Sequence, residues 1–436
     1  MRVLYLTTEF LWPAHQGGRV RSLAQLRLLA AQPEVTQLTV LSLAEVAVTP
    51  AELAALRAAV VEPAQPARPG TSPRGGLKVE VLPPLHHPIH LKQAPAELLR
   101  VAVARARTGV PYLATKWRSA ALERVLLREL EGGGYDLVYF DHLGMALYLP
   151  MVRRACPAAR LVVDEHNVES DFFAQFAARA PLPLRPLARF EHAAAARFEA
   201  ETLAAADAVV AISQLDADAL TALTLRHTGK RMQPQVVPQV VQSAEPRRPP
   251  PAEPRLGYVG NLTWHPNALG LSWFCAAVWP RLQRELPAAR LSIAGSGLAL
   301  DGQGRPLAPR AWRRPGIEVL GYLAELEELY PRCLGVIAPI LGGSGVRIKL
   351  LEAFRAGMPV VTTTAGAAGL PITSGVEALI EDEPDRFARA VLTLCQDTAL
   401  QDGLRAAGYA FLRVHHSPQR AAAALRAALG LAPATP

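Results

Sequence analysis

Cysteine is scarce in this sequence, and none of its cysteines lies in a pattern typical of a metal site. The chain has four, Cys156, Cys275, Cys333 and Cys395, scattered through 436 residues without a CxxC pair. Neither a disulfide framework nor a thiolate metal site is therefore indicated. We expect all four side chains to be buried and reduced.

Long apolar runs are lacking as well. The longest, residues 268–280, is shorter than the roughly 20 residues that a membrane span needs. The apolar run at residues 3–6 is short and is followed by Thr7, Thr8 and Glu9, which is typical of a strand rather than a signal peptide. We expect no transmembrane helix and a cytoplasmic protein.

Aromatic residues make up only 6% of the chain, and no zinc-finger spacing or RNP-like string is present. The net charge of +8 favours anionic partners, which include nucleic acid, membrane surfaces and phosphorylated small molecules. Because the basic residues are dispersed, nucleic acid is the least favoured of the three, and we expect no nucleic-acid partner.

Strand patterns alternate with helical patterns in two series, and the length of the chain predicts two domains. This alternation is typical of doubly wound, mostly parallel sheets, whose ligands bind at the carboxyl ends of strands. The predicted strands are 2–8, 38–43, 78–82, 136–140, 161–164, 208–212 and 235–237 in the first series, and 256–259, 290–294, 317–320, 335–338 and 360–363 in the second.

A segment rich in proline and charge, EPRRPPPAEP at residues 245–254, separates the two series and predicts a linker. The N-terminal domain is then 1–244 and the C-terminal domain 255–415. Residues 416–436 carry a helical pattern at 418–429, which we expect to pack across the domains. Two further segments rich in proline or glycine, 63–76 and 301–315, predict surface loops without chemistry.

The string GGSGVRIKLLEA follows a strand of the second series and predicts an anion site. A helix is expected to begin near Ser344 or Gly345. Glycine loops let a ligand approach the backbone, and the free N–H groups of a first helical turn bind phosphate. The backbone of Gly343, Gly345 and Val346 would then hold the phosphates.

Two cations, Arg347 and Lys349, fall in the predicted first turn, where they oppose the helix dipole by about 0.3 to 1 kcal/mol each. A bound diphosphate would compensate, because it is attracted to both cations and to the helix end. Glu352 lies on the same helical face, and its carboxylate suits a ribose diol. The alternative is an exposed helix surface with a weak salt bridge.

The segment resembles the donor site of family four retaining glycosyltransferases of the GT-B fold, in a subgroup whose loop reads GGSGVRIKLLEA, and the likeness spans nearly the whole chain. The resemblance implies two Rossmann-like domains facing a central cleft, with a nucleotide-diphosphate sugar as co-substrate and neither cofactor nor metal. It also implies a hexosyltransferase in which Glu352 binds the nucleotide ribose.

Two departures from the family pattern concern charge. Ser344 stands where the first of two family glutamates contacts the donor sugar. Asn261 and Pro266, in the string GNLTWHP, stand where many members carry an arginine and a lysine that grip the diphosphate. Our hypothesis is that Arg347 and Lys349 supply the missing charge, with Asn261 still part of the donor site.

Three glycine-loop residues, Gly17, Gly18 and Arg19, follow the first strand of the N-terminal domain. The loop could bring its backbone to a donor phosphate, with Arg19 and Arg21 adding positive potential on the acceptor side. The alternative is a glycine turn that serves only close helix packing.

The string DEHNVE follows another strand of that domain and gathers groups that can hydrogen-bond a sugar hydroxyl. Glu165 and Asn167 are expected on the acceptor side and His166 in the catalytic site, although a lone histidine is often only structural. Asp141 and His142 also follow a strand, where family members often place an active-site histidine. Both are candidate catalytic residues, and so is Glu352.

By resemblance, the donor phosphate helps to deprotonate the acceptor, so no protein nucleophile is needed. The acceptor would be a glycan or lipid-linked sugar in the synthesis of cell-envelope or extracellular polysaccharide or glycolipid. Basic residues amid apolar ones at 86–130, such as Lys116 and Arg118, are compatible with contact to the inner face of the membrane or with a solvated helix. A catalytically silent homologue that binds another transferase is the alternative function.

Overall fold

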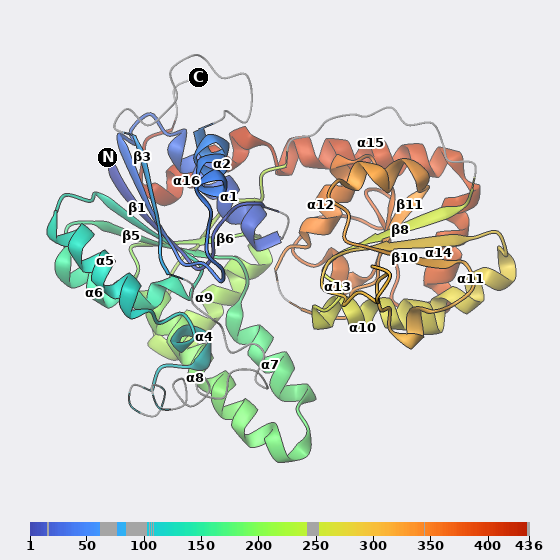
Figure 1. Ribbon diagram of the computed structural model, residues 1–436, viewed down its shortest axis with the longest axis horizontal. Helices are drawn as coiled ribbons and strands as arrows, with labels where there is room; N and C mark the ends of the chain where they lie inside the picture. Colours follow the sequence, from blue (N-terminus) through green and yellow to red (C-terminus); the bar gives the residue numbers. More distant parts are fainter. Residues whose placement is uncertain are drawn as a thin grey trace. The chain divides into compact units, whose positions relative to one another are not determined.

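The chain folds into two compact units. The first unit contains Met1–Val240 and Pro418–Pro436, and the second contains Val241–Ser417 (Figure 1). The computed structural model describes residues 1–14, 17–61, 76–83, 103, 105, 107, 109–241, 253–343 and 345–433. The predicted linker and the predicted loop at 63–76 lie almost wholly outside these residues.

The first unit is built on a seven-stranded parallel sheet in the order β3-β2-β1-β4-β5-β6-β7. The order reverses between β1 and β4, and ligands of doubly wound sheets bind at such a reversal, beside the carboxyl ends of the strands. The strands are β1 (Arg2–Thr7), β2 (Gln37–Ser42), β3 (Leu77–Val81), β4 (Leu137–Asp141), β5 (Arg160–Glu165), β6 (Ala208–Ala211) and β7 (Gln235–Val236).

Both faces of this sheet are buried, which explains why its strands are continuously apolar. Val3 and Tyr5 of β1 pack into one core cluster, whereas Leu4 and Leu6 pack into another on the opposite face. The helices are α1 (Gly17–Ala30), α2 (Pro50–Val61), α4 (Tyr112–Thr115), α5 (Ala120–Glu131), α6 (Leu149–Ala155), α7 (Glu169–Arg179), α8 (Arg185–Ala205), α9 (Gln214–Thr228) and α16 (Pro418–Leu429).

The C-terminal helix α16 packs in the first unit, although it follows the whole second unit in sequence. Leu425 and Leu429 belong to the core cluster that contains β1 and α1. Arg426 donates to Gln32 Oε1 at 2.9 Å and to Glu34 Oε1 at 2.6 Å. This helix therefore completes the core of the N-terminal half of the chain.

The second unit is built on a six-stranded parallel sheet in the order β10-β9-β8-β11-β12-β13, which reverses between β8 and β11. Its strands are β8 (Arg255–Val259), β9 (Arg290–Ala294), β10 (Ile317–Gly321), β11 (Gly335–Ala338), β12 (Val360–Thr362) and β13 (Leu379–Ile380). Its helices are α10 (His265–Trp273), α11 (Trp279–Glu285), α12 (Ile348–Arg355), α13 (Thr364–Ala367), α14 (Pro384–Gln396) and α15 (Thr398–His415).

The predicted α/β class with two Rossmann-like, doubly wound parallel sheets is confirmed. Each predicted strand is present within one residue at either end, and among the strands of the described residues only the two-residue β13 was missed. Such a short strand carries too few residues to show a pattern. Within the described ranges, no helix is long and apolar enough to cross a membrane.

The predicted surface loop at 301–315 is exposed over most of its length but contains a buried tryptophan. Trp312, in the predicted surface loop at 301–315, is 1% exposed, and its indole N–H donates to Ser272 Oγ at 2.9 Å. Proline and glycine indicate an irregular backbone but say nothing about which side chains it buries. All four cysteines are free as expected, but Cys156 and Cys395 are only half-buried.

Candidate functional site

The glycine loop of the second unit joins β11 to α12. The helix begins at Ile348, so the prediction of a start near Ser344 or Gly345 was wrong. Gly343 and Gly345 have φ angles of 116° and 78°, which a right-handed helix cannot contain. The loop is therefore longer than predicted, and Ser344 lies outside the described residues.

Lys349 reaches from the first turn of α12 to the carboxyl end of β8. Its Nζ donates to Asn267 Oδ1 at 2.8 Å and lies 4.9 Å from the centroid of the Tyr258 ring. A Cβ atom on Gly260 would come within 3.0 Å of the same Nζ. Since β8 and β11 flank the reversal of the sheet, this ammonium lies where a doubly wound sheet binds its ligand.

The charge of Lys349 is costly in this position. Burial, and then the charge of Arg347, lower the pKa of the Lys349 ammonium to about 7. Arg347 curls back over the loop, since its Nη2 donates to the Gly342 carbonyl at 3.4 Å and would lie 2.9 Å from a Cβ on Gly343. Two neighbouring cations at a glycine loop create a site that an anion would stabilise.

The loop after β9 approaches this site backbone to backbone. A Cβ atom on Gly295 would lie 1.7 Å from the Gly260 carbonyl oxygen, so no other residue fits at Gly295 without movement. The close packing fixes the start of the loop GNLTWHP, and Asn267, which follows this loop on α10, accepts the hydrogen bond from Lys349.

The side chain of Asn261 stabilises the turn that precedes α10. Its Oδ1 accepts from the backbone N–H groups of Thr263 at 3.0 Å and Trp264 at 3.1 Å. Its carbonyl accepts from Asn267 Nδ2 at 3.0 Å. The residue predicted to contact the donor thus has a side-chain oxygen already occupied by its own turn, while Asn267, which the sequence analysis missed, connects that turn to Lys349.

Glu352 lies one helical turn beyond Lys349. Its carboxylate is 3.6 Å from Arg355 Nη2, and its side chain is 29% exposed. A partly exposed pair of this kind stabilises a helix weakly. It leaves a half-buried carboxylate on the helix that follows the glycine loop, and the predicted ribose contact stays a prediction.

In the first unit, β1, β4 and β5 end in polar side chains that contact one another. Asp141 is fully buried, accepts a hydrogen bond from Thr7 Oγ1 at 2.7 Å, and lies 2.9 Å from His166 Nε2. Burial by itself would raise the pKa of Asp141, but His166 and the hydrogen bonds lower it well below its usual value. Asp141 is therefore ionised.

An ionised Asp141 fixes the tautomer of His166, because a carboxylate can only accept. In the neutral imidazole, Nε2 then carries the proton and Nδ1 keeps its lone pair. Nδ1 is buried and has no hydrogen-bond partner within the described part of the chain. His166 thus offers an acceptor for a hydroxyl, which is the kind of group it was predicted to bind.

His142 is the sole non-glycine residue with a positive φ among those the structure describes, at 74°. Its ring centroid lies 3.6 Å from that of His166. Burial, and then His166, lower the pKa of His142, so its imidazole is neutral near neutral pH. A strained backbone at a strand end is typical of functional sites, because the surrounding structure must hold it there.

Asp141, His142 and His166 also satisfy the spacing of a metal site, since their ligand atoms lie within 4.8 Å of one another. Two imidazoles and a carboxylate are common ligands of transition metals. Asp141 and His166 also form a direct hydrogen bond at 2.9 Å, which needs no metal, so the cluster has two interpretations.

Glu165 is 1% exposed, and neither of its carboxylate oxygens has a hydrogen-bond partner in the part of the chain that the structure describes. Burial, and then the charge of Glu199, raise its pKa well above the usual value. Burial also raises the pKa of Glu199 to about 7, although Glu199 accepts from the N–H groups of Glu169 and Ser170 at 2.8 and 2.9 Å. Asn167, its predicted companion, is half-buried.

Gly17, Gly18 and Arg19, predicted to form a glycine loop, are instead the first turn of α1, which lies beside His142. A Cβ atom on Gly18 would be 3.9 Å from His142 Nε2, and Gly17 is the first residue of α1. Arg19 donates to Glu9 Oε2 at 2.6 Å, so its charge is balanced by that carboxylate. Arg21, expected to add positive potential, is instead 1% exposed and bonded to Asp164 at 2.7 Å.

Four contacting residues were missed by the sequence analysis, and their positions explain why. Thr7 ends a buried strand and gave a usable signal, because polar residues at carboxyl ends of strands line ligand sites. Tyr139 donates to Asp164 at 2.8 Å from inside a strand, where its pattern shows only a core residue. Asn267 and Glu199 lie on helices, and nothing in the sequence distinguishes them from surface residues.

Comparisons with known proteins agree with this architecture. Residues 253–397 match the family model of glycosyl transferases group 1. A relative from Klebsiella pneumoniae, an uncharacterized 44.6 kDa protein in the cps region, is 26% identical over 165 residues. That match covers 37% of this chain and 42% of the relative, so it spans less than half of either protein.

Several solved structures share the whole fold. HepE of Anabaena, in complex with UDP-glucose, is 14% identical with a TM-score of 0.60 and covers 99% of this chain and 100% of its own. Sucrose-phosphate synthase from Thermosynechococcus elongatus is 14% identical with a TM-score of 0.59, covering 97% and 96%. The lipopolysaccharide outer core galactosyltransferase WaaB is 12% identical with a TM-score of 0.57, covering 99% of both chains. The two units thus form the predicted GT-B fold.

Proposed function

We propose that this GT-B chain is a retaining glycosyltransferase that moves a sugar from a nucleotide-diphosphate donor to a hydroxyl acceptor. The observation that carries the proposal is the position of Lys349. Its ammonium extends from α12 to Asn267 and Gly260 at the reversal of the second sheet, beside the glycine loop. The match of residues 253–397 to glycosyl transferases group 1 supports the same assignment.

The donor diphosphate would lie against the glycine loop and the first turn of α12. Free N–H groups of Gly343, Gly345 and Val346 would face it, as at other phosphate sites at helix N-termini. Arg347 and Lys349 would balance its charge, and the diphosphate in turn would favour the charged form of Lys349. In HepE, a protein of the same fold, UDP-glucose is bound.

Many family members carry an arginine and a lysine at the positions of Asn261 and Pro266. Arg347 and Lys349 would supply this positive charge instead. The contact between Lys349 and Asn267 supports this relocation, because it brings an ammonium from α12 to the loop where the family's arginine and lysine are expected. Ser344 would contact the donor sugar and Glu352 the ribose, as the resemblance implies.

The acceptor would bind at the strand ends of the first unit. His166 would accept a hydrogen bond from a sugar hydroxyl through Nδ1, while Asp141 and Thr7 hold its ring. The neighbouring His142 and the backbone of Gly17 and Gly18 would shape the same edge. Glycan and lipid-linked sugars both present such hydroxyl groups.

The reaction would break the bond between C1 of the donor sugar and its phosphate oxygen and form a bond from C1 to the acceptor oxygen. The acceptor proton would move to the departing phosphate on the same face, so the configuration at C1 is retained. The protein would act electrostatically, because Arg347, Lys349 and the loop N–H groups stabilise the charge of the leaving diphosphate. These groups would act without a metal.

The biological context is proposed from the relative in the cps region of Klebsiella pneumoniae, which points to the synthesis of cell-envelope or extracellular polysaccharide. The acceptor would then be a growing glycan or a glycolipid, and the enzyme would act in the cytoplasm at the inner face of the membrane. The transferred group would be a hexose.

Donor binding tests the proposal directly. Thermal shifts with a panel of nucleotide sugars should identify a donor, and the doubly substituted R347A/K349A protein should lose that shift. A matched double variant, R284A/R313A, removes two exposed arginines of the same unit and should keep it. Equal shifts in all three proteins, or no shift with any donor, would contradict the donor site.

Product analysis separates the two candidate functions. An active enzyme should give slow donor hydrolysis or transfer, and NMR of the product should show the anomeric configuration of the donor. A silent homologue would bind the donor without releasing sugar, an outcome favoured by the occupied side chain of Asn261. An inverted product would overturn the retaining mechanism but not the donor site.

A further inference from the structure

The helices α7 and α8 form a hairpin that runs away from the sheet of the first unit (green in Figure 1). They meet at a short 3₁₀ turn, Leu182–Leu184. Apart from Ala188, every buried residue of α8 is at Ala195 or beyond. Only the C-terminal part of α8 therefore packs into the unit, while its N-terminal turns form an extended arm.

The end of this arm has its small residues inside and its large apolar residues outside. Among the described side chains, Ala177, Ala180 and Ala188 form a small buried cluster that joins the two helices there. The larger side chains point to solvent: Leu182 is 76% exposed, Leu184 53%, Leu187 65% and Phe190 63%. Each of these four residues is more than half exposed, which is unfavourable for apolar side chains in water.

The backbone of the hairpin turn has few N–H groups that depend on water for a hydrogen bond. Pro181, Pro183 and Pro186 have no N–H group, and the N–H groups of Leu184 and Arg185 both donate to the Pro181 carbonyl. Few backbone donors would therefore lose hydrogen bonds to water if the turn entered an apolar phase. The three prolines also fix φ, so the leucines are held outward at a small cost in entropy.

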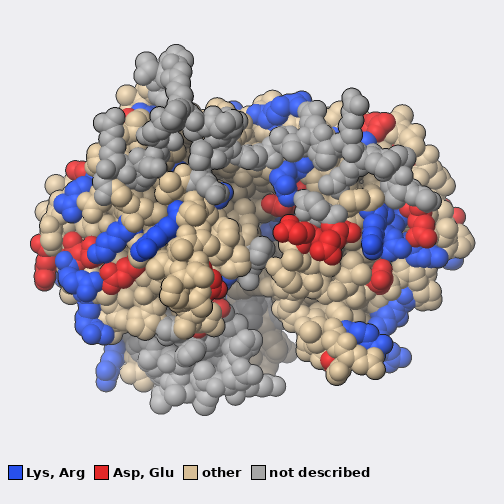
Figure 2. Space-filling view, turned by 45° about the horizontal axis from the view of Figure 1, so that its top comes forward, with Lys and Arg blue, Asp and Glu red and all other residues tan. Residues whose placement is uncertain are grey.

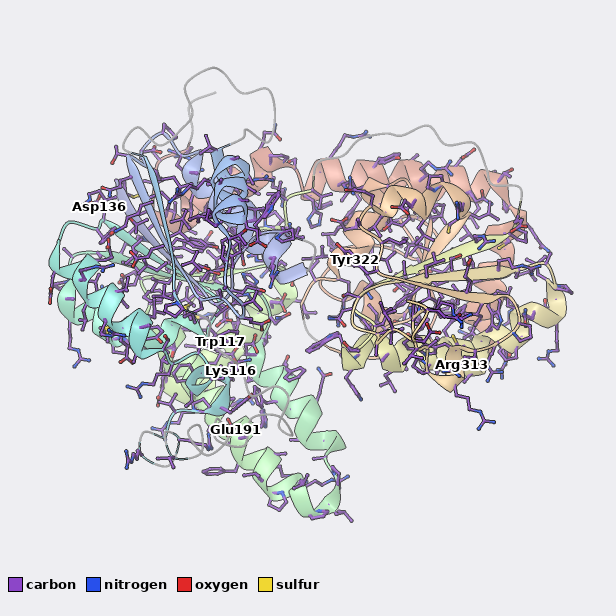
Figure 3. All side chains as sticks on the ribbon, in the orientation of Figure 1. Lys116, Trp117, Asp136, Glu191, Arg313 and Tyr322 are labelled. Atoms are coloured by element: carbon purple, nitrogen blue, oxygen red, sulfur yellow. The ribbon has the colours of Figure 1, made fainter. Side chains whose placement is uncertain are left out.

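The charge of the segment has one sign. Residues 172–190 contain Arg179, Arg185 and Arg189 and no acidic residue. The next acid, Glu191 on α8, is neutralised by Arg105 at 2.6 Å (Figure 3). The guanidinium of Arg105 also lies 4.8 Å from the centroid of the Phe190 ring.

Lys and Arg side chains lie among Asp and Glu over the described surface that faces the viewer in Figure 2. Two basic residues of the region predicted to touch a membrane, 86–130, have partners within the described part of the chain. Lys116 lies 4.8 Å from the Trp117 ring centroid, and Arg118 pairs with Glu123 at 3.1 Å. Much of that region is outside the described residues.

We propose that the hairpin tip, residues 181–190, docks on the surface of a lipid bilayer with anionic headgroups. Leucine and phenylalanine side chains would enter the boundary between headgroups and acyl chains, and Arg185 and Arg189 would bind lipid phosphates. The tip combines four exposed apolar side chains with arginines and no acidic residue, and an anionic bilayer complements both features.

The arm begins at the strand edge that carries the proposed acceptor site. Helix α7 starts at Glu169, three residues after His166 on the same loop. A bilayer bound at the tip would therefore be linked to His166 by a short helical connection. That the acceptor is lipid-linked rests on the proposed function, but docking of the tip does not.

Vesicle flotation with the full chain, in the absence of donor, tests the docking. We expect binding to vesicles of phosphatidylcholine with phosphatidylglycerol and much weaker binding to phosphatidylcholine alone. The variant L182S/L184S/L187S should bind the anionic vesicles at least about tenfold more weakly, since three apolar side chains no longer enter the interface. R189Q should weaken binding to the anionic vesicles alone.

A matched variant, L215S/L300S/V414S, removes three apolar side chains that are 58%, 60% and 58% exposed elsewhere, and it should bind as the wild type does. Equal binding by the two triple variants, or no binding by the wild type, would overturn the proposal. So would light scattering that shows wild-type dimers dissociated by L182S/L184S/L187S, because the tip would then join two copies. Thermal shifts with the donor should be unchanged in every variant, which separates failure of the docking from failure of the donor site.

Discussion

Lys349 on α12 and Asn267 on α10 meet at 2.8 Å although 82 residues separate them. The contact connects the helix that follows the glycine loop to the carboxyl end of β8. It orients the Lys349 ammonium at the point where the strand order of the sheet reverses. The amide of Asn267 accepts from Lys349 and donates to the Asn261 carbonyl at 3.0 Å, so it fixes the position of Lys349 relative to the turn.

The first prediction concerns this pair. K349A should weaken donor binding by about tenfold or more, because a charge-assisted contact to phosphate contributes about 1.5–3 kcal/mol. N267A should weaken it less, since Lys349 keeps its charge but loses its orientation. Isothermal titration calorimetry measures both, with R284A as the control. If N267A bound the donor more weakly than K349A does, Asn267 would do more than orient Lys349.

Donor affinity should depend on pH through Lys349. The pKa of its ammonium in the free protein is about 7, and a bound diphosphate favours the charged form. Above about pH 7, binding therefore takes up a proton, and affinity should fall by up to tenfold per pH unit toward about pH 9. A nucleotide sugar, whose diphosphate does not titrate in this range, is the suitable probe.

The K349R protein is the control for this pH dependence, because a guanidinium remains charged throughout the range. It should bind the donor with little change between the same pH values. A wild-type affinity that is flat with pH would show that Lys349 does not contact the diphosphate.

Glu165 should make the fold less stable at high pH. Its pKa is raised in the folded state, so the folded protein holds a proton that the unfolded chain releases as pH rises above the usual glutamate pKa. Stability due to this group is therefore lost with rising pH. E165Q cannot ionise, and its melting temperature relative to wild type should rise by a few degrees, about 2–4 °C, from about pH 5 to about pH 8.

The exposed Glu131 provides the comparison, and E131Q should show no such change between the two pH values. Differential scanning fluorimetry across the pH range is sufficient. A constant difference between E165Q and wild type would mean that Glu165 ionises normally in the fold.

His166 should affect turnover more than donor binding. H166A removes the Nδ1 acceptor, and D141N exchanges the carboxylate that fixes the tautomer, so both should lower kcat by about 100-fold. KM for the donor should change little, because the proposed phosphate contacts are in the second unit. The exposed His227 offers a control variant, H227A, with normal kcat. A raised donor KM with unchanged kcat would contradict the acceptor-side role.

Gly295 should be intolerant of a side chain. A Cβ atom there would lie 1.7 Å from the Gly260 carbonyl oxygen, so G295A must move one of the two loops at a cost of about 1–3 kcal/mol. G302A is the matched control, because nothing lies within 4 Å of a Cβ atom at Gly302. Urea unfolding followed by fluorescence should show an earlier transition for G295A alone, and coincident curves would refute the close packing.

The sequence predicted the doubly wound architecture almost completely. Buried parallel strands are short apolar runs, and local periodicity is enough to recognise them, which explains why every predicted strand of the first unit is present within one residue. Helix α16 was likewise predicted at its observed bounds. Its packing in the first unit was not, because a pattern shows which face is apolar and not which core that face joins.

The candidate site was predicted in part. Asp141 and His166 were named because each follows a strand, and the parallel sheet brings those strand ends into contact. The buried environment of Glu165 and the ion pair of Arg21 with Asp164 were not foreseen. Each depends on side chains from other elements, which neighbouring residues in the sequence do not reveal.

The sequence by itself determined the glycine loop, its two cations and the positions of the strands along the chain. These features follow from local conformational preference and apolar periodicity. Only the tertiary structure decided that α12 starts at Ile348, that Lys349 meets Asn267, and that the leucines of the hairpin tip face outward. Long-range contacts and exposure depend on how distant segments pack, and that free energy is a property of the whole fold rather than of any stretch of residues.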